Sequence, residues 1–152
     1  MSYVKKVLQP NETVVAEGRK HWIIYVPGLL LIILALLVFF VGPAVYDLPL
    51  VYQIVAGLFG LFGLITLLRA WFLQWTTEIA VTNRRLIYKT GFISRFTTEM
   101  NMDKIESVAV DQTLFGRLFG YGTVSARGTG VGIENLEAIA DPLQLRSAIV
   151  VR

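Results

Sequence analysis

Two long stretches without a charged side chain constrain this chain more than any other feature of its sequence. The first covers residues 22–46 and the second covers residues 48–68, with Asp47 between them. Each stretch is long enough for one bilayer crossing, which takes about 20 apolar residues. A helix satisfies its own backbone hydrogen bonds in hydrocarbon. The sequence therefore predicts a transmembrane helical hairpin over residues 22–72, with helices at about 22–42 and 49–72.

Basic residues around these stretches predict their orientation in the membrane. Arg19 and Lys20 precede the first stretch, and Arg69, Arg84 and Arg85 follow the second, whereas the turn between them has no Lys or Arg. By the positive-inside rule, both chain termini are expected in the cytoplasm of a prokaryotic cell, with the protein in its plasma membrane. A cleaved signal peptide is disfavoured, because its apolar part has roughly 7–15 residues and the stretch here is longer.

The composition excludes several classes of site. The 152 residues include no cysteine and one histidine, His21, so disulfides, thiolate sites and clusters of imidazole ligands are excluded. The formal net charge is +3. In a membrane protein, a small basic excess reflects topology and lipid head groups, so we expect no nucleic-acid partner. No metal or cofactor site is expected.

The remainder of the chain, residues 74–152, predicts a cytoplasmic unit of antiparallel strands. Alternating or β-branched residues indicate strands at 78–82, 86–89, 96–102, 105–110, 124–127 and 136–140. Asn83-Arg84 is typical of a turn between the first two strands. Asp141 followed by Pro142 predicts the beginning of a closing helix over residues 143–151. Such a meander must curl to bury its apolar face.

The cytoplasmic N-terminal segment, residues 1–21, leaves two alternatives. The run 13–16 contains β-branched residues suited to a strand, and this strand would pair with the sheet formed later in the chain. The segment could equally be a flexible polar lead-in. Both alternatives stay open, because strand propensity depends on context.

Three motifs in residues 74–152 resemble the bacterial pleckstrin-homology-like (PH-like) membrane proteins of the YdbS-like group. They are TNRRL at 82–86, MDKIESV at 102–108 and GRLFGYGTV at 116–124. The closing helix and the preceding pair of apolar helices are similar to that family too. The resemblance implies a strongly bent, seven-stranded antiparallel β-barrel or sandwich capped by the C-terminal helix. It implies no known reaction, and phosphoinositide binding does not carry over from eukaryotic PH domains.

Four basic residues near the first predicted hairpin are candidates for binding a head group or a partner: Arg84, Arg85, Lys89 and Arg95. Arginine grips phosphate with two hydrogen bonds. Each basic residue beside an anionic leaflet contributes about 1 kcal/mol to membrane binding. The favoured interpretation is nevertheless that these residues set topology and solubility, because such charges need no ligand.

A short apolar segment is the second candidate site: Leu114, Phe115, Leu118 and Phe119. These residues lie at helical spacing, and they could insert into the membrane interface or bind a partner. The favoured interpretation is that they cover one end of the small barrel, because a small domain needs all of its apolar side chains for the core.

Small residues in the second apolar helix are candidates for close helix packing: Ala56, Gly57, Gly60 and Gly63. Spacings of three or four place them near one helix face, where another helix can approach closely. The favoured interpretation is packing against the first helix of the same hairpin. A contact between subunits is the alternative.

Four carboxylates gather late in the chain: Glu99, Asp103, Glu106 and Asp111. No histidine, serine-based motif or glycine-rich phosphate loop accompanies them, so no catalytic constellation is visible. We expect them to form a solvated acidic edge paired with Arg95 and Lys104. An enzyme acting on lipid is therefore disfavoured.

These features predict a membrane-anchored, non-enzymatic PH-like binding or adaptor module at the cytoplasmic face. It would recognise a protein partner or anionic lipid head groups. The alternative is a structural homo-oligomer that assembles through the glycine-rich helix face and exposed strand edges.

Overall fold

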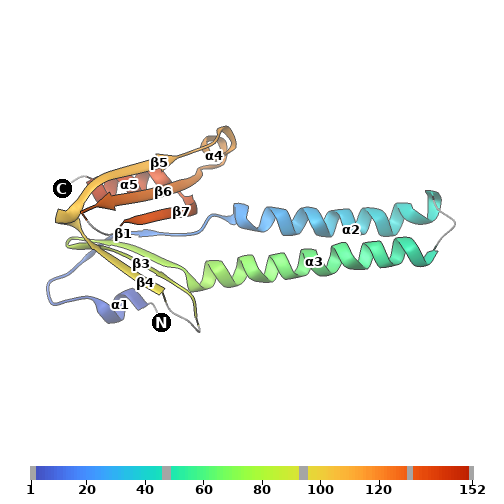
Figure 1. The fold of residues 1–152 in the computed structure, drawn as a ribbon, viewed down its shortest axis with the longest axis horizontal. Coiled ribbons are helices and arrows are strands. Elements are labelled where there is room, and N and C mark those ends of the chain that lie inside the picture. The colour runs from blue at the N-terminus through green and yellow to red at the C-terminus, as the bar shows by residue number, and fades with distance from the viewer. Residues whose placement is uncertain (1–2, 46–48, 93–95, 130–131, 151–152) are drawn as a thin grey trace. The chain divides into compact units, whose positions relative to one another are not determined.

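The computed structural model describes residues 3–45, 49–92, 96–129 and 132–150. The chain divides into two compact units (Figure 1). A helical unit contains Trp22–Phe72, and a β-rich unit contains Met1–His21 together with Leu73–Arg152. The β-rich unit is therefore assembled from segments on both sides of the apolar stretches.

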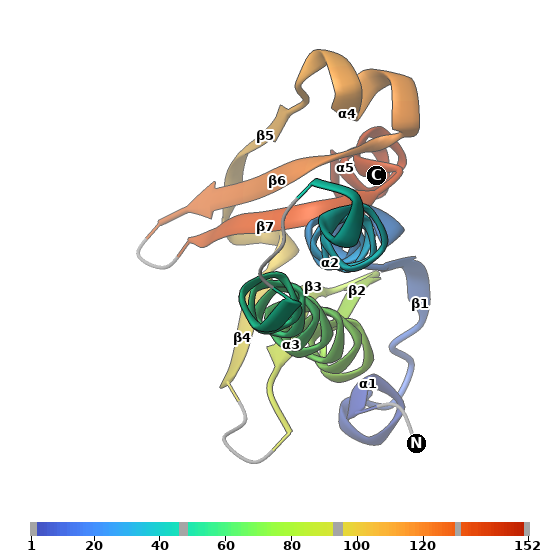
Figure 2. The same ribbon diagram turned by 90° about the vertical axis from the view of Figure 1, so that its right-hand side faces the viewer.

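The helical unit is an antiparallel pair of long apolar helices, which run side by side when seen end-on (Figure 2). A 3₁₀ turn at Trp22–Tyr25 leads into α2 (Val26–Val45), and α3 spans Pro49–Thr76. By length and composition, both helices are apolar enough to cross a membrane. α2 continues past Pro43, where the sequence suggested that it ends.

The four small residues of α3 have different surroundings. A Cβ atom added at Gly63 would lie 2.8 Å from the Cδ1 atom of Ile32, and one added at Gly60 would lie 3.9 Å from the Cβ atom of Ala35. A Cβ atom added at Gly57 would meet nothing within 4 Å. Ala56 is buried. Gly63 and Gly60 thus face α2 of the same hairpin, as the favoured interpretation holds, whereas Gly57 has open space beside it.

Two antiparallel sheets make up the β-rich unit (Figures 1 and 2). The first has the order β1-β2-β3-β4, from strands Val14–Gly18, Glu78–Thr82, Arg85–Thr90 and Phe96–Asn101. The second has the order β5-β6-β7, from strands Ile105–Asp111, Tyr121–Gly128 and Ile133–Ala140. The short helices are α1 (Tyr3–Val7), the 3₁₀ turn η2 (Met102–Lys104) and α4 (Leu114–Phe119), and α5 (Pro142–Val150) closes the unit. This arrangement is compatible with the PH-like fold implied by the resemblance.

β1 resolves the alternative left open for the N-terminal segment. It pairs with β2 in antiparallel register, with Val14 opposite Thr82 and Gly18 opposite Ile79. The idea of a flexible polar lead-in is therefore wrong for residues 14–18. Because β2 follows α3 directly, this pairing connects the chain before the first apolar helix to the chain after the second.

The core lies between the two sheets and α5. Its buried side chains come from both sheets and from α5, and include Val81, Leu86, Val124, Leu136, Ile139, Leu145 and Ile149. Pro142 begins α5, as predicted, and the carbonyl of Asp141 accepts hydrogen bonds from the backbone N–H groups of Gln144 and Leu145. The strand expected at 96–102 ends at Asn101, because the chain turns there into η2. α1 was not predicted from the sequence.

The glycine environments predict different tolerance to a large side chain. Gly63→Leu should destabilise the hairpin by about 1–3 kcal/mol, since it overpacks the contact with Ile32. Gly57→Leu, the matched control, should leave stability unchanged. Thermal unfolding of the purified full-length chain in detergent measures both. Equal losses of thermal stability in the two variants would contradict this packing. A lower native mass for Gly57→Leu alone would favour a subunit contact at that position.

Candidate functional site

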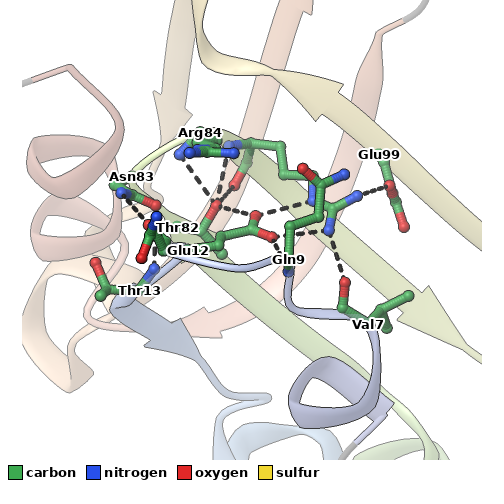
Figure 3. A network of polar contacts seen from close by, with 10 residues as sticks. Val7, Gln9, Glu12, Thr13, Thr82, Asn83, Arg84 and Glu99 are labelled. Carbon is green, nitrogen blue, oxygen red and sulfur yellow. Dashed lines mark hydrogen bonds and ion pairs between the residues drawn. The ribbon is translucent and has the colours of Figure 1, made fainter.

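A buried carboxylate, Glu12, is the centre of a polar network at the β2–β3 turn (Figure 3). Its side chain is 0% exposed. One carboxylate oxygen accepts hydrogen bonds from Oγ1 of Thr82 at 2.8 Å and from Nε of Arg85 at 2.9 Å. The other oxygen accepts from Nη2 of Arg85 at 2.8 Å and from the backbone N–H of Gln9 at 2.8 Å. Glu12 thus fastens the N-terminal segment to β2 and β3.

The guanidinium group of Arg85 is satisfied from three directions. Besides the two bonds to Glu12, Nη1 donates to Oε2 of Glu99 at 2.6 Å, and Nη2 donates to the carbonyl of Val7 at 2.8 Å. The hydrogen bond from Arg85 lowers the pKa of Glu12 to about 2, and the hydrogen bond to Glu12 raises the pKa of Arg85. Both groups therefore stay charged near neutral pH and serve the structure.

The β2–β3 turn is locked to the N-terminal segment by a second set of bonds (Figure 3). The backbone N–H of Thr13 donates to Oδ1 of Asn83 at 3.1 Å, and the N–H of Asn83 donates to the carbonyl of Thr13 at 3.1 Å. Oγ1 of Thr82 accepts from the N–H groups of Arg84 and Arg85 at 3.2 and 2.9 Å. The turn is consequently rigid, and it presents Arg84 to solvent.

An open pocket lies beside this turn. This turn pocket has a volume of about 810 Å³ and combines polar and apolar side chains, namely Gln9, Val15, Thr82, Asn83, Arg84, Arg85, Asn101, Met102, Asp103, Ala148 and Ile149. A second hollow of about 360 Å³ is lined by Met102, Asp103, Ile105, Glu106, Ser107, Val108, Ile149 and Val150, and we call it the β5 groove. The two share Met102, Asp103 and Ile149, so they are adjacent.

The β5 groove follows the edge of a strand. It is lined by four consecutive residues of β5, residues 105–108, and the pairing of β5 with β6 is irregular between Ile105 and Ser107. β5 is an edge strand of its sheet, with β6 as its neighbour within the described residues. α5 forms the other wall through Ile149 and Val150. An unpaired strand edge beside a helix is suited to adding an extended peptide.

The four basic candidates do not gather into one exposed cluster. Arg84 is exposed at the turn pocket, whereas Arg85 is held by Glu12 and Glu99. Lys89 is buried, and its Nζ atom donates to the carbonyl of Thr76 at 3.2 Å. Arg95 lies outside the described residues. Binding of a ligand by any of the four stays a prediction, but Arg85 and Lys89 already have partners inside the unit.

The apolar candidates are exposed on α4, so the expectation that they cover one end of the barrel is wrong. Leu114 is 82% exposed, Leu118 76%, Phe115 68% and Phe119 45%. The helix instead packs through Gly116, where an added Cβ atom would lie 2.7 Å from the carbonyl oxygen of Tyr121. The seven strands and α5 bury a core without these side chains.

The acidic residues also differ from expectation. Glu99 pairs with Arg85, a partner that the sequence did not suggest, while the expected partner Arg95 lies outside the described residues. No group of three or more His, Asp or Glu residues that could hold a metal ion occurs in the part of the chain that the structure describes. Sequence reasoning missed Glu12, because its partner Arg85 is 73 positions away and no local pattern links them.

Comparison with known proteins gives a family and no named relative. A family model described as a bacterial PH domain matches residues 22–148. No curated protein and no solved structure matches the chain.

The network predicts that the two neighbouring arginines of the turn differ in importance for stability. Arg85→Leu leaves the buried carboxylate of Glu12 without its charged partner and should cost about 3 kcal/mol. Arg84→Leu, the matched control, should change stability little, since Arg84 is exposed. Chemical unfolding of the full-length chain in detergent measures the difference. Similar losses of unfolding free energy in Arg85→Leu and Arg84→Leu would rule out the structural role of Arg85.

The lowered pKa of Glu12 predicts a pH dependence with a definite sign. A carboxylate whose pKa is depressed on folding contributes stability above its unfolded pKa of about 4.3, and loses it as the pH falls. Since the folded pKa is about 2, wild type should exceed Glu12→Gln in stability at pH 7, and this excess should shrink between about pH 4.5 and pH 2. Unfolding midpoints of both proteins across this range test it. An excess that stays constant with pH would contradict it.

Proposed function

Because the chain belongs to the bacterial PH domain family, we propose that it is a membrane-anchored, non-enzymatic binding module that holds an extended protein segment in the β5 groove. The family supports a binding role. The proposal adds the anchor, the orientation and the class of partner, and each rests on its own observation.

The anchor rests on the two apolar helices and their flanking charges. Both helices pass the length and hydropathy required for a span, and most of their side chains are exposed, as expected of helices surrounded by lipid. Arg19 and Lys20 before α2, and Arg69 near the end of α3, orient the hairpin with both chain termini in the cytoplasm. The pairing of β1 with β2 requires both segments on one side of the membrane, and the basic residues are the argument for which side that is.

The unpaired edge of β5 beside α5 is the observation that carries the choice of a protein partner. An added strand would gain main-chain hydrogen bonds along this edge and side-chain contacts with Ile149 and Val150. The adjoining turn pocket offers Arg84 and Asn101. Arg84 is suited to an acidic side chain or a terminal carboxylate of the same segment.

Anionic head groups fit this site less well. The chain leaves the apolar helix at Thr76, before β2 begins. Arg84 follows the other end of β2. β2, which lies between the two points, has five residues and is about 17 Å long at about 3.3 Å per residue. A homo-oligomer built through the helix glycines is also disfavoured, since Gly60 and Gly63 already face α2.

Photo-crosslinking in the membranes of the native host tests the proposed partner. A photoreactive amino acid at Ser107 or Val150, both exposed at the β5 groove, should crosslink to one common protein. The same probe at Arg146, exposed on α5 outside the groove lining, is the matched control and should not. Arg84→Glu should weaken the crosslink. Equal yields at all three positions, or none at the groove, would overturn the proposal.

Amide exchange separates this proposal from head-group binding. The full-length chain in nanodiscs of neutral lipid is compared with the same chain in nanodiscs containing anionic lipid. We expect exchange in residues 82–86 to be the same in both. Slower exchange in anionic nanodiscs, lost on Arg84→Glu, would favour head groups as the ligand.

A further inference from the structure

α4 is an ordered helix that exposes apolar side chains, and this surface is separate from the β5 groove. Oγ1 of Thr113 accepts a hydrogen bond from the backbone N–H of Gly116 at 3.0 Å and caps the helix. Gly120, with a φ of +75°, ends it in the left-handed conformation. Nε2 of Gln112 donates to the carbonyl of Tyr121 at 3.0 Å across the base. The helix is thus built to hold its four apolar side chains in place.

The position of α4 in the β-rich unit suggests what covers it. Figure 1 shows α4 within the connection between β5 and β6. Tyr121, two residues after α4, stacks on His21 with a centroid distance of 5.4 Å. The backbone N–H of His21 donates a hydrogen bond to the backbone carbonyl of Ala138 in β7 at 2.7 Å. The next residue in the chain is Trp22, where the first apolar segment begins.

A second apolar feature lies where the chain leaves the other apolar helix. Trp75, next to the last residue of α3, stacks on Phe92 with a centroid distance of 5.6 Å. Phe92 is 54% exposed and Phe96 61%, and both belong to the β3–β4 hairpin. Both places where the chain passes between the units are therefore accompanied by exposed apolar side chains of the β-rich unit.

The charges of α4 fit a membrane surface. The helix contains Arg117, which is exposed, and no carboxylate, and Arg19 is exposed near His21. Leucine and phenylalanine beside arginine are typical of segments that lie in the interfacial layer of a bilayer. There the rings and aliphatic chains leave water, while the guanidinium group stays at the head groups.

We propose that α4, together with Phe92 and Phe96, inserts into the interfacial layer of the bilayer that the apolar helices cross. The β-rich unit is then held against the membrane at three places, namely the two connections to the helices and α4. This proposal rests on the membrane anchor of the proposed function, and it assigns a surface that the anchor alone does not require.

Single-cysteine labelling tests this directly, because the chain contains no cysteine. The full-length protein is reconstituted in liposomes with a nitroxide at Leu118→Cys, and its accessibility to oxygen and to a water-soluble nickel complex is measured. We expect oxygen to reach the label more readily than the nickel complex does, as for a site in lipid. The matched control is Ser147→Cys on α5, exposed in the same unit, where the nickel complex should dominate.

Two further labels distinguish the possible failures. A label at Leu61→Cys on α3 reports the anchor itself. Lipid-like accessibility at Leu61 with water-like accessibility at Leu118 would overturn this inference and leave the anchor intact. Water-like accessibility at both would overturn both. If the label at Leu118 is shielded from both oxygen and the nickel complex, α4 contacts protein, and insertion is overturned. If that shielding is lost when the protein is diluted to one chain per vesicle, the contact is with a second copy, and insertion is again overturned.

Discussion

The pairing of β1 with β2, reinforced by the buried Glu12–Arg85 ion pair, is the interaction on which the rest of the β-rich unit depends. It joins residues that precede the apolar helices to residues that follow them. The first sheet would otherwise begin at β2, and Arg85 would lose the buried carboxylate that accepts two of its hydrogen bonds. A fragment beginning at residue 74 lacks β1 and Glu12, so it is not equivalent to the unit seen here.

Much of the fold could be predicted because its signals are local. Alternation in the sequence located the strands after α3, and Pro142 located the start of α5. Spacing along α3 predicted a small-residue face, and an added Cβ atom at Gly60 or Gly63 would lie beside α2. Each of these inferences depends on residues a few positions apart, where periodicity and backbone preference determine the outcome.

The site could be predicted less well because its contacts are long-range. Arg85 looked like one of four similar surface cations, and its partner Glu12 lies on the other side of both apolar helices. Exposure of α4 was mispredicted for a different reason. Composition gives the amount of apolar side chain in a small unit, but it does not identify which side chains are buried. Here the strands and α5 form the core, and Leu114 and Leu118 are exposed.

The register of the strands places contrasting surfaces at opposite ends of the β-rich unit. The end of β1 at Gly18 and the start of β2 at Ile79 are paired, and His21, Tyr121 and Trp75 lie near the same end. The turn pocket is at the other end of β2. Apolar side chains gather where the chain enters and leaves the helices, and polar groups gather about one strand length away.

This separation makes the two proposals compatible. If α4 occupied lipid on the same side as the β5 groove, a partner would have to compete with the membrane for access. The groove is instead lined by the first residues of β5, whereas α4 follows the last residue of that strand. One strand thus has its start at the proposed partner site and its end at the proposed lipid contact.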